Sequence, residues 1–319
     1  MLEENNSNWE RSVLEKLAMS AIQEQRRARH WSIFFKVLTF GYLFILLFLF
    51  LGVFDGDKDG GLSGNKHTAL IDLNGVIAAG SNANADNLIA SLQDAFDDKN
   101  TAGIVLRINS PGGSPVQSAL VNDEIRRLRG LHPEIPLHVV VEDMCASGGY
   151  FIAAAADKIY VNRSSIVGSI GVLMDGFGFT GTMQKLGVER RLMTAGENKG
   201  FMDPFSPRNP KHEAFTKQLL DDVHQQFIDV VRQGRGKRLK ETPEMFSGLF
   251  WTGDKAIKMG LADELGSVDS VARDVFKAEK IVDFTAHENI ADRLAKKLGA
   301  GVASAFPGFG AEAAGVTLR

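Results

Sequence analysis

From about residue 67 onward, short apolar runs alternate with segments in which apolar residues recur every three or four positions. The runs have the length of buried strands, and the recurring apolar positions would share one face of a helix. Such an alternation favours right-handed βαβ units, so we predict an α/β fold with a mainly parallel sheet and flanking helices. The predicted strands are 69–73, 103–108, 137–141 and 158–161, and the predicted helices are 88–96, 115–128, 148–156, 211–233, 255–259 and 268–280.

A longer apolar stretch, Ile33–Phe54, precedes this region and contains one charged residue, Lys36. The 18 residues from Val37 to Phe54 would form a helix of roughly 27 Å, which is enough to cross the hydrocarbon core of a membrane. Arginines precede the stretch and aspartates follow it, so the positive-inside bias places the N-terminus in the cytoplasm and the rest of the chain outside it. The stretch is too long for a cleaved signal peptide and no small-residue cleavage site follows it, so we predict an uncleaved signal anchor.

The pattern divides the chain into five parts. Residues 1–31 are expected to form a cytoplasmic tail, either a short amphipathic helix or a solvated segment, and residues 32–54 form the transmembrane anchor. Residues 55–66 have the composition of a linker. Residues 67–280 form the predicted folded domain, and residues 281–319 are a C-terminal extension whose Ala- and Gly-rich tail we expect to be mobile.

Composition narrows the function classes. The formal net charge is −3 and no basic stripe with interleaved aromatics occurs, so we expect no nucleic-acid partner. Cys145 is the single cysteine, which excludes an internal disulfide and a cysteine-cluster metal site. We expect neither a metal nor another cofactor.

The serine at position 147 lies between a predicted buried strand and a predicted helix, and two glycines and an alanine-rich run follow it. A hydroxyl at this position would be held at the N-terminus of the helix, where free N–H groups and the helix dipole favour negative charge. A serine here is also a common N-cap of a packing helix, so the motif alone leaves a nucleophile and a structural cap open. Cys145 is a rival nucleophile, but a free cysteine is usually a small buried hydrophobe.

A second turn, INSPGG at residues 108–113, ends another predicted strand and opens a helix. Adjacent glycines can present backbone N–H groups to an oxyanion, although a Pro-Gly pair by itself is more often an ordinary turn. Because open α/β sheets place their sites at the carboxyl ends of the strands, the two turns together favour a site.

A nucleophilic serine needs a base, and the sequence offers two kinds. None of the histidines lies in a motif, so a Ser-His-Asp triad is not excluded but nothing marks one; they are His30, His67, His132, His138, His212, His224 and His287. Lysine is the alternative base in Ser-Lys variants of the triad. Lys199 lies in a loop-like stretch with glycine, proline and apolar neighbours, although a surface lysine beside Glu197 would look the same.

Taken together, ASGGYFIA at 146–153, INSPGG, VGSIGV at 167–172 and the lysine at 199 resemble the signal peptide peptidase A family of membrane-bound serine peptidases. The chain is similar to the short, single-repeat, SohB-like bacterial form of this S49-type family. The resemblance covers roughly residues 67–280 and includes WTGDKAIKMGLADELGSVDS at 251–270.

The resemblance implies a fold shared with the Clp proteases and crotonases, and a Ser-Lys dyad. Carried over by position, Ser147 is the nucleophile and Lys199 the general base, and Ser169 is expected to hold the lysine amine by a hydrogen bond. The backbone N–H groups of Gly113 and Gly148 would form the oxyanion hole.

The resemblance also implies substrates, partners and a location. The substrates would be signal-peptide remnants or other short apolar peptides at the membrane, and the chain would assemble into a homo-oligomeric ring. It would be a single-pass protein of the bacterial inner membrane, with its catalytic domain on the periplasmic side. Two alternatives remain open, a crotonase-type acyl-CoA enzyme and a catalytically degenerate membrane scaffold.

Overall fold

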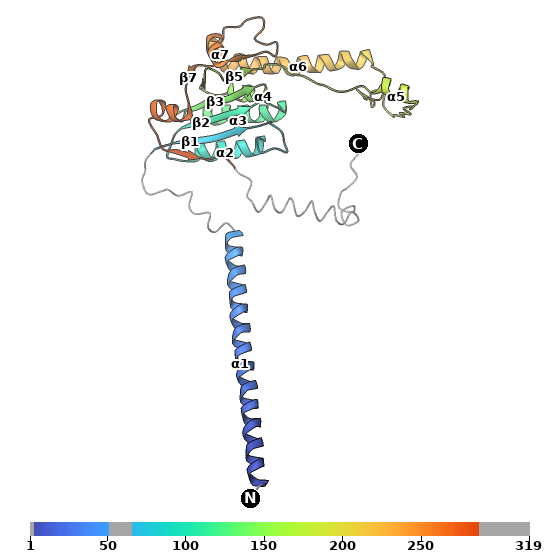
Figure 1. Ribbon diagram of the computed structural model, residues 1–319. Coiled ribbons are helices and arrows are strands. Elements are labelled where there is room, and N and C mark those ends of the chain that lie inside the picture. Colours follow the sequence, from blue (N-terminus) through green and yellow to red (C-terminus); the bar gives the residue numbers. More distant parts are fainter. Residues whose placement is uncertain (1–2, 51–65, 287–319) are drawn as a thin grey trace. The chain divides into compact units, whose positions relative to one another are not determined.

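The structure is a computed structural model that describes residues 3–50 and 66–286 (Figure 1). The chain divides into two units: one holds the N-terminal helix α1, and the other is a folded domain between Gly64 and Glu288. Residues 51–65 and 287–319 lie outside the described parts. They include the predicted linker up to residue 65, the end of the predicted anchor, His287 and the Ala- and Gly-rich tail.

Helix α1 runs without a break from Glu3 to Phe50. The predicted tail helix and the predicted anchor are therefore one helix, because the sequence between them holds neither a proline nor another helix-breaking residue. Its segment Gln23–Leu47 is long and apolar enough to cross a membrane. This segment overlaps the predicted anchor and begins about three turns earlier, on the arginine-rich side.

The folded domain is built on a mostly parallel sheet with the strand order β6-β5-β3-β2-β1-β8 (Figure 1). In addition, β4 pairs with β3, and β7 pairs with β4. The pair β5–β6 is antiparallel and the other strand pairs are parallel. The strands are β1 His67–Asn74, β2 Thr101–Ser110, β3 Leu137–Ala146, β4 Lys158–Val161, β5 Ile166–Gly168, β6 Phe250–Thr252, β7 Glu264–Leu265 and β8 Ile281–Asp283.

Helices connect most of the strands. They are α2 Ala85–Asp97, α3 Pro115–Leu131, α4 Gly148–Ala153, α5 Thr180–Leu186, α6 Pro210–Arg235, α7 Gly253–Met259 and α8 Val268–Ser270, with a short 3₁₀ turn at Gly236–Arg238 and a π-helical turn at Val271–Val275. Asn84 and Ser114 cap α2 and α3, and Pro115 occupies the first turn of α3.

Alternation along the strands separates two cores. On one face, side chains such as Ile71, Leu106 and Val139 pack with α2, α3, α4 and α6 in the larger core. On the other face, Leu70, Val105 and Val140 pack with Tyr160 and Val271 in a smaller core. Both faces of the central strands are therefore covered, as expected for a parallel sheet.

The structure confirms the predicted α/β fold and the predicted strands and helices, with one exception. The predicted helix at 268–280 is wrong in its second half, because the helical turns end at Val275. The Phe276 ring packs on Gly103 so closely that a Cβ added to Gly103 would lie 2.6 Å from it. The next residue, Lys277, has a positive φ of 55°. The short strands β5, β6, β7 and β8 and the helix α5 are not predicted by the sequence pattern.

Candidate active site

Three neighbouring parallel strands bring the predicted site residues to one edge of the sheet. Strand β2 ends at Ser110, just before the Pro-Gly-Gly turn; β3 ends at Ala146, before Ser147; and β5 ends at Gly168, before Ser169. Cys145 pairs with Ser110, and Ala146 pairs with Gly168, so the three carboxyl ends lie side by side. This is the edge where open α/β sheets place their sites.

Ser147 occupies a sharp turn between β3 and α4. Its backbone has φ 50° and ψ −122°, a conformation that costs a non-glycine residue about 1–3 kcal/mol and is concentrated at functional sites. Two hydrogen bonds hold this backbone: the Ser147 N–H donates to the Gly168 carbonyl at 2.9 Å, and the Phe151 N–H donates to the Ser147 carbonyl at 2.9 Å. The Ser147 side chain makes no cap hydrogen bond to α4, so the structure does not use it as an ordinary N-cap.

The two glycine turns lie in direct contact. A Cβ added to Gly112 would lie 2.6 Å from the Gly148 nitrogen, and one added to Gly148 would lie 3.2 Å from the Gly113 nitrogen. The Ile77 N–H donates to the Gly112 carbonyl at 2.9 Å, and the Ser114 N–H donates to the Ile77 carbonyl at 2.8 Å. Neither hydrogen bond uses the Gly113 N–H. The N–H groups of Gly113 and Gly148 are thus neighbours beside Ser147.

Ser169 reaches the same place from β5. It also has a positive φ, 53°, and its N–H donates to the Leu249 carbonyl at 2.8 Å. Gly171 and Gly248 pack so closely that a Cβ on Gly171 would lie 3.0 Å from the Gly248 Cα. The segment before β6 therefore fixes the loop that carries Ser169.

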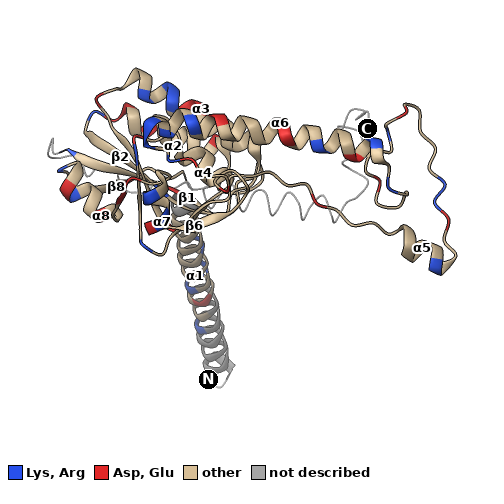
Figure 2. Ribbon diagram, turned by 90° about the horizontal axis from the view of Figure 1, so that it is seen from above, with Lys and Arg blue, Asp and Glu red and all other residues tan. Residues whose placement is uncertain are grey.

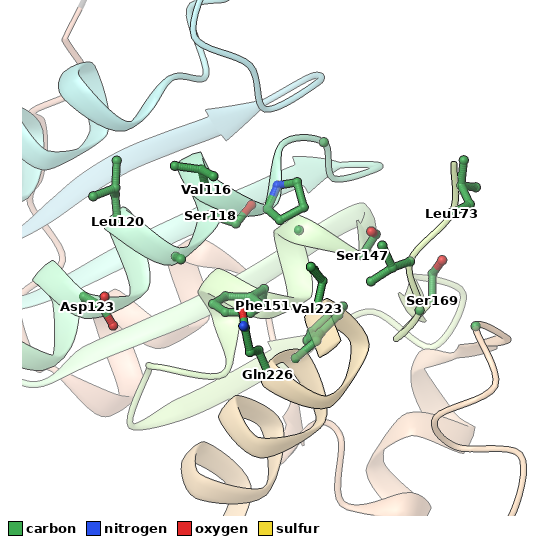
Figure 3. A pocket seen from close by; sticks show the side chains of 18 of the residues that line it. Val116, Ser118, Leu120, Asp123, Ser147, Phe151, Ser169, Leu173, Val223 and Gln226 are labelled. Atoms are coloured by element: carbon green, nitrogen blue, oxygen red, sulfur yellow. The ribbon is translucent and has the colours of Figure 1, made fainter. Parts of the chain in front are cut away.

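A cavity of about 780 Å³ opens at this edge (Figure 3). Ser147, Ser169, Gly113 and Gly148 all line it, so the structure brings four of the five predicted site residues together. Its walls come from α3, α4 and α6 and are largely apolar; they include Val116, Leu120, Phe151, Val223 and Phe227. Within the described residues, the structure gives neither serine hydroxyl a hydrogen-bond partner.

Sequence reasoning did not identify the α6 wall or Asp123 as parts of the cavity. The periodicity of α6 shows an apolar face, but it does not show that this face ends beside a serine. The position of α6 is fixed by the buried Arg235, which donates two hydrogen bonds to Asp263, at 2.9 and 2.8 Å. Burial acts to raise the pKa of Asp263, but the hydrogen bonds and charge of Arg235, the Ile159 N–H and the charge of Arg238 together outweigh it, so the pKa is lowered.

Lys199, the fifth predicted residue, does not line the cavity of its own chain. It is exposed and lies in a long excursion between β5 and α6, residues 171–209, which we call the arm. Phe201 packs on His212 and Phe215 in the first turns of α6, with ring centroids 4.9 and 5.8 Å apart. The cavity wall begins only at Val223, so roughly 12 Å of helix separates Phe215 from it. Figures 1 and 2 show α5 beyond the same distant end of α6.

Cys145 and the histidines are the alternative candidates for the nucleophile and the base. Cys145 is fully buried in β3, and burial raises the pKa of its thiol, so it stays protonated and unreactive. Among the described histidines none lines the cavity. His224 follows the lining residue Val223 in the sequence, but its ring Nε2 lies 3.2 Å from the Ile170 carbonyl oxygen. The described residues therefore offer no Ser-His pair at this site.

A serine held at a strand end, beside two neighbouring backbone N–H groups and under an apolar cavity, is an arrangement typical of serine hydrolases built on an α/β sheet. Residues 130–282 match the sequence model of Peptidase family S49, whose members have a Clp-protease-like fold, and this match supports an S49-type peptidase.

Relatives with assigned names agree with a serine peptidase. The chain is 30% identical to Protease 4 of Haemophilus influenzae over 67% of its own length and 35% of that protein. It is 29% identical to a candidate signal peptide peptidase SppA of Enterococcus faecium, over 70% of this chain and 67% of the relative. A higher identity, 47%, is found with the Na(+)/H(+) antiporter NhaA of Brucella melitensis, but the match covers 58% of this chain and 25% of the antiporter. The chain thus spans about a quarter of the length of that relative.

Proposed function

We propose that this protein is a membrane-anchored serine endopeptidase in which Ser147 of one copy works with Lys199 of a second copy. One observation carries this proposal: the Ser147 hydroxyl lies beside the Gly113 and Gly148 N–H groups, while no histidine or lysine of the described residues lines its cavity. We take Ser147 as the nucleophile and these two N–H groups as the oxyanion donors, all from one chain, so the proposed base would come from another copy.

The reaction is acyl transfer to water. The neutral Lys199 amine accepts the proton of the Ser147 hydroxyl as its oxygen attacks the peptide carbonyl carbon. The resulting oxyanion accepts hydrogen bonds from the Gly113 and Gly148 N–H groups. The carbon–nitrogen bond then breaks, the lysine returns its proton to the leaving amine, and water hydrolyses the acyl-serine with the lysine again as base. Ser169 holds the lysine amine.

The exposed surface of the arm suggests that the lysine comes from a second copy of this chain. The arm exposes large apolar side chains to solvent: Leu173 is 80% exposed, Phe177 80%, Leu186 72% and Met193 94%. An apolar surface of this kind marks an interface. If the arm of one copy packs on the domain of the next, the contacts are heterologous, and such contacts form a ring when the rotation between copies closes.

The anchor and the apolar cavity suit the same class of substrate. We propose that α1 crosses the inner membrane of a bacterium once, with the N-terminus in the cytoplasm and the domain on the periplasmic side, because the arginines precede the apolar segment. A domain held at that surface meets short apolar peptides, such as the remnants of cleaved signal peptides. The walls of the cavity would take their side chains.

Other functions are less well supported. A crotonase-type acyl-CoA enzyme would use the same oxyanion turn, but its substrate is cytoplasmic and it would leave Ser147 unused. A degenerate scaffold would have no reason to keep Ser147 in a strained backbone conformation. Antiport is not proposed either, since the described residues hold one helix that could cross a membrane and the match covers a quarter of that relative.

Mixing two inactive variants tests the shared site. Full-length Ser147→Ala and Lys199→Ala proteins, each inactive alone in detergent on an apolar fluorogenic peptide, should regain activity when they are co-assembled with different affinity tags. Random mixing in a ring would restore about one quarter of the wild-type sites. The matched control pairs Ser147→Ala with a copy that carries both substitutions, and it should stay inactive.

The other outcomes are equally informative. Doubly tagged assemblies without activity would show that both residues act within one chain. Activity in Lys199→Ala alone would show a different base. Failure of the wild-type protein to cleave any peptide would favour the scaffold.

A further inference from the structure

The cavity continues well beyond Ser147, along one face of α3. Val116, Leu120 and Asp123 recur at helical spacing on this face, and all three line the cavity. From Val116 to Asp123 the helix rises about 10 Å. Figure 3 shows Asp123 on the side of the cavity opposite to Ser147 and Ser169.

The middle of the cavity is apolar and its far end is polar. Phe151 of α4 and Phe227 of α6 lie with their ring centroids 5.1 Å apart, and Val116 and Leu120 are 67% and 47% exposed toward open space. Asp123 lies at the far end, and Gln226 of α6 also lines the cavity, next to Phe151 in Figure 3. A ligand that fills the cavity therefore passes apolar walls before it meets polar groups.

Asp123 is the one ionisable side chain among the described residues that line the cavity. The described part of the chain gives it no hydrogen bond and no ion pair. Arg126 is the guanidinium that interacts electrostatically with it. That group is engaged elsewhere, since it donates to the Asn122 side chain at 2.7 Å and to the Val230 carbonyl at 3.4 Å.

We propose that this cavity receives the side chain that precedes the scissile bond, and that Asp123 selects long side chains with a cationic end, lysine or arginine. The proposal rests on the proposed peptidase function and names a specificity residue for it. A lysine side chain extends about 6 Å from its Cα, and an N–H···O bond adds about 3 Å, so its ammonium group can approach the carboxylate. Its methylene stem would lie along Leu120 and Phe227, as lysine stems commonly do on apolar surfaces.

Matched peptides test the selection on the full-length protein in detergent. Four fluorogenic peptides share one sequence and differ only before the scissile bond, where they carry norleucine, lysine, acetyl-lysine or glutamate. The measured quantity is the ratio of kcat/KM for lysine to kcat/KM for norleucine. Asp123→Asn should lower this ratio about tenfold, because one charge-assisted contact is lost. Asp123→Lys should raise the ratio of the glutamate to the lysine peptide by more than that.

A control variant on α2 separates the loss of the Asp123 carboxylate from the loss of any surface carboxylate. Asp94→Asn removes an exposed carboxylate of α2 that does not line the cavity, and it should leave the lysine to norleucine ratio at the wild-type value. An unchanged ratio in Asp123→Asn, or equal cleavage of the lysine and acetyl-lysine peptides by the wild type, would overturn the selection. The proposed peptidase function would survive that result, since it fails only if the wild type cleaves none of the peptides.

Discussion

Backbone strain gathers at the cavity. Four described non-glycine residues have a positive φ, and two of them are Ser147 and Ser169. Both follow a strand end, and both are held by a backbone hydrogen bond to a neighbouring segment, Ser147 to Gly168 and Ser169 to Leu249. Such conformations persist only where the surroundings fix them, and here each one directs a hydroxyl into the cavity.

The strain at Ser147 predicts a difference between two inactive variants. Ser147→Ala keeps a Cβ and therefore keeps the strained conformation, whereas Ser147→Gly adopts it freely. We expect Ser147→Gly to be more stable than Ser147→Ala by about 1 kcal/mol, after the larger entropy of glycine in the unfolded chain is offset. Thermal denaturation of the full-length proteins in detergent measures the difference. Equal stability would mean that the turn is not strained.

At the scale of elements, the sequence predicts the strands and helices that are determined by residues close together in the chain. Apolar runs locate β2 and β3, although the predicted ends at residues 108 and 141 lie before the observed ends at Ser110 and Ala146, and the parallel order follows from the helices between the strands. Strands of two or three residues, such as β7, carry no period that a pattern can reveal. The apolar face of α6 is visible in the sequence, but its neighbours are not, so Asp123 and the α6 wall appear only in the folded chain. Lys199 as the base stays a prediction.

The smaller core predicts a dependence of stability on pH. His138 is buried at the start of β3 against Phe276, with ring centroids 4.9 Å apart, and burial lowers its pKa to about 4. Its Nδ1 atom has no hydrogen-bond partner among the described residues. The folded protein therefore keeps this histidine neutral, whereas the unfolded chain protonates it as the pH falls below about 6.5.

Stability should thus be lost on acidification between about pH 6.5 and pH 4. Between pH 7 and pH 5 the contribution of His138 is about 2 kcal/mol, and His67, whose pKa burial also lowers, acts in the same direction. His138→Leu should reduce this loss by about that amount. Chemical denaturation of wild type and variant at both pH values measures it. The same loss in both proteins would show that His138 is accessible to protons in the folded state.

At the scale of the whole molecule, the arm holds Lys199 away from the cavity that Ser147 lines. Two contacts shape the arm: the rings of Phe179 and Phe205 stack 5.4 Å apart, and the Thr180 hydroxyl donates to the Ser206 carbonyl at 3.1 Å. A segment with its own contacts and with apolar side chains turned outward is typical of a surface that binds a partner. If that partner is the next copy, assembly and catalysis depend on the same surface.

Charge on the arm should therefore remove assembly and activity together. Phe177→Lys places a cation where the side chain is 80% exposed, so the fold should keep its far-UV circular dichroism. Association should weaken at least tenfold, since a charge would be buried in an apolar contact without a partner, and peptidase activity should fall in proportion. Leu131→Lys is the matched control: this leucine is 62% exposed at the end of α3, away from the arm, and its variant should assemble normally. Light scattering of the detergent-solubilised proteins gives the oligomer size. A fully active Phe177→Lys monomer would place the whole catalytic site within one chain and exclude the shared dyad.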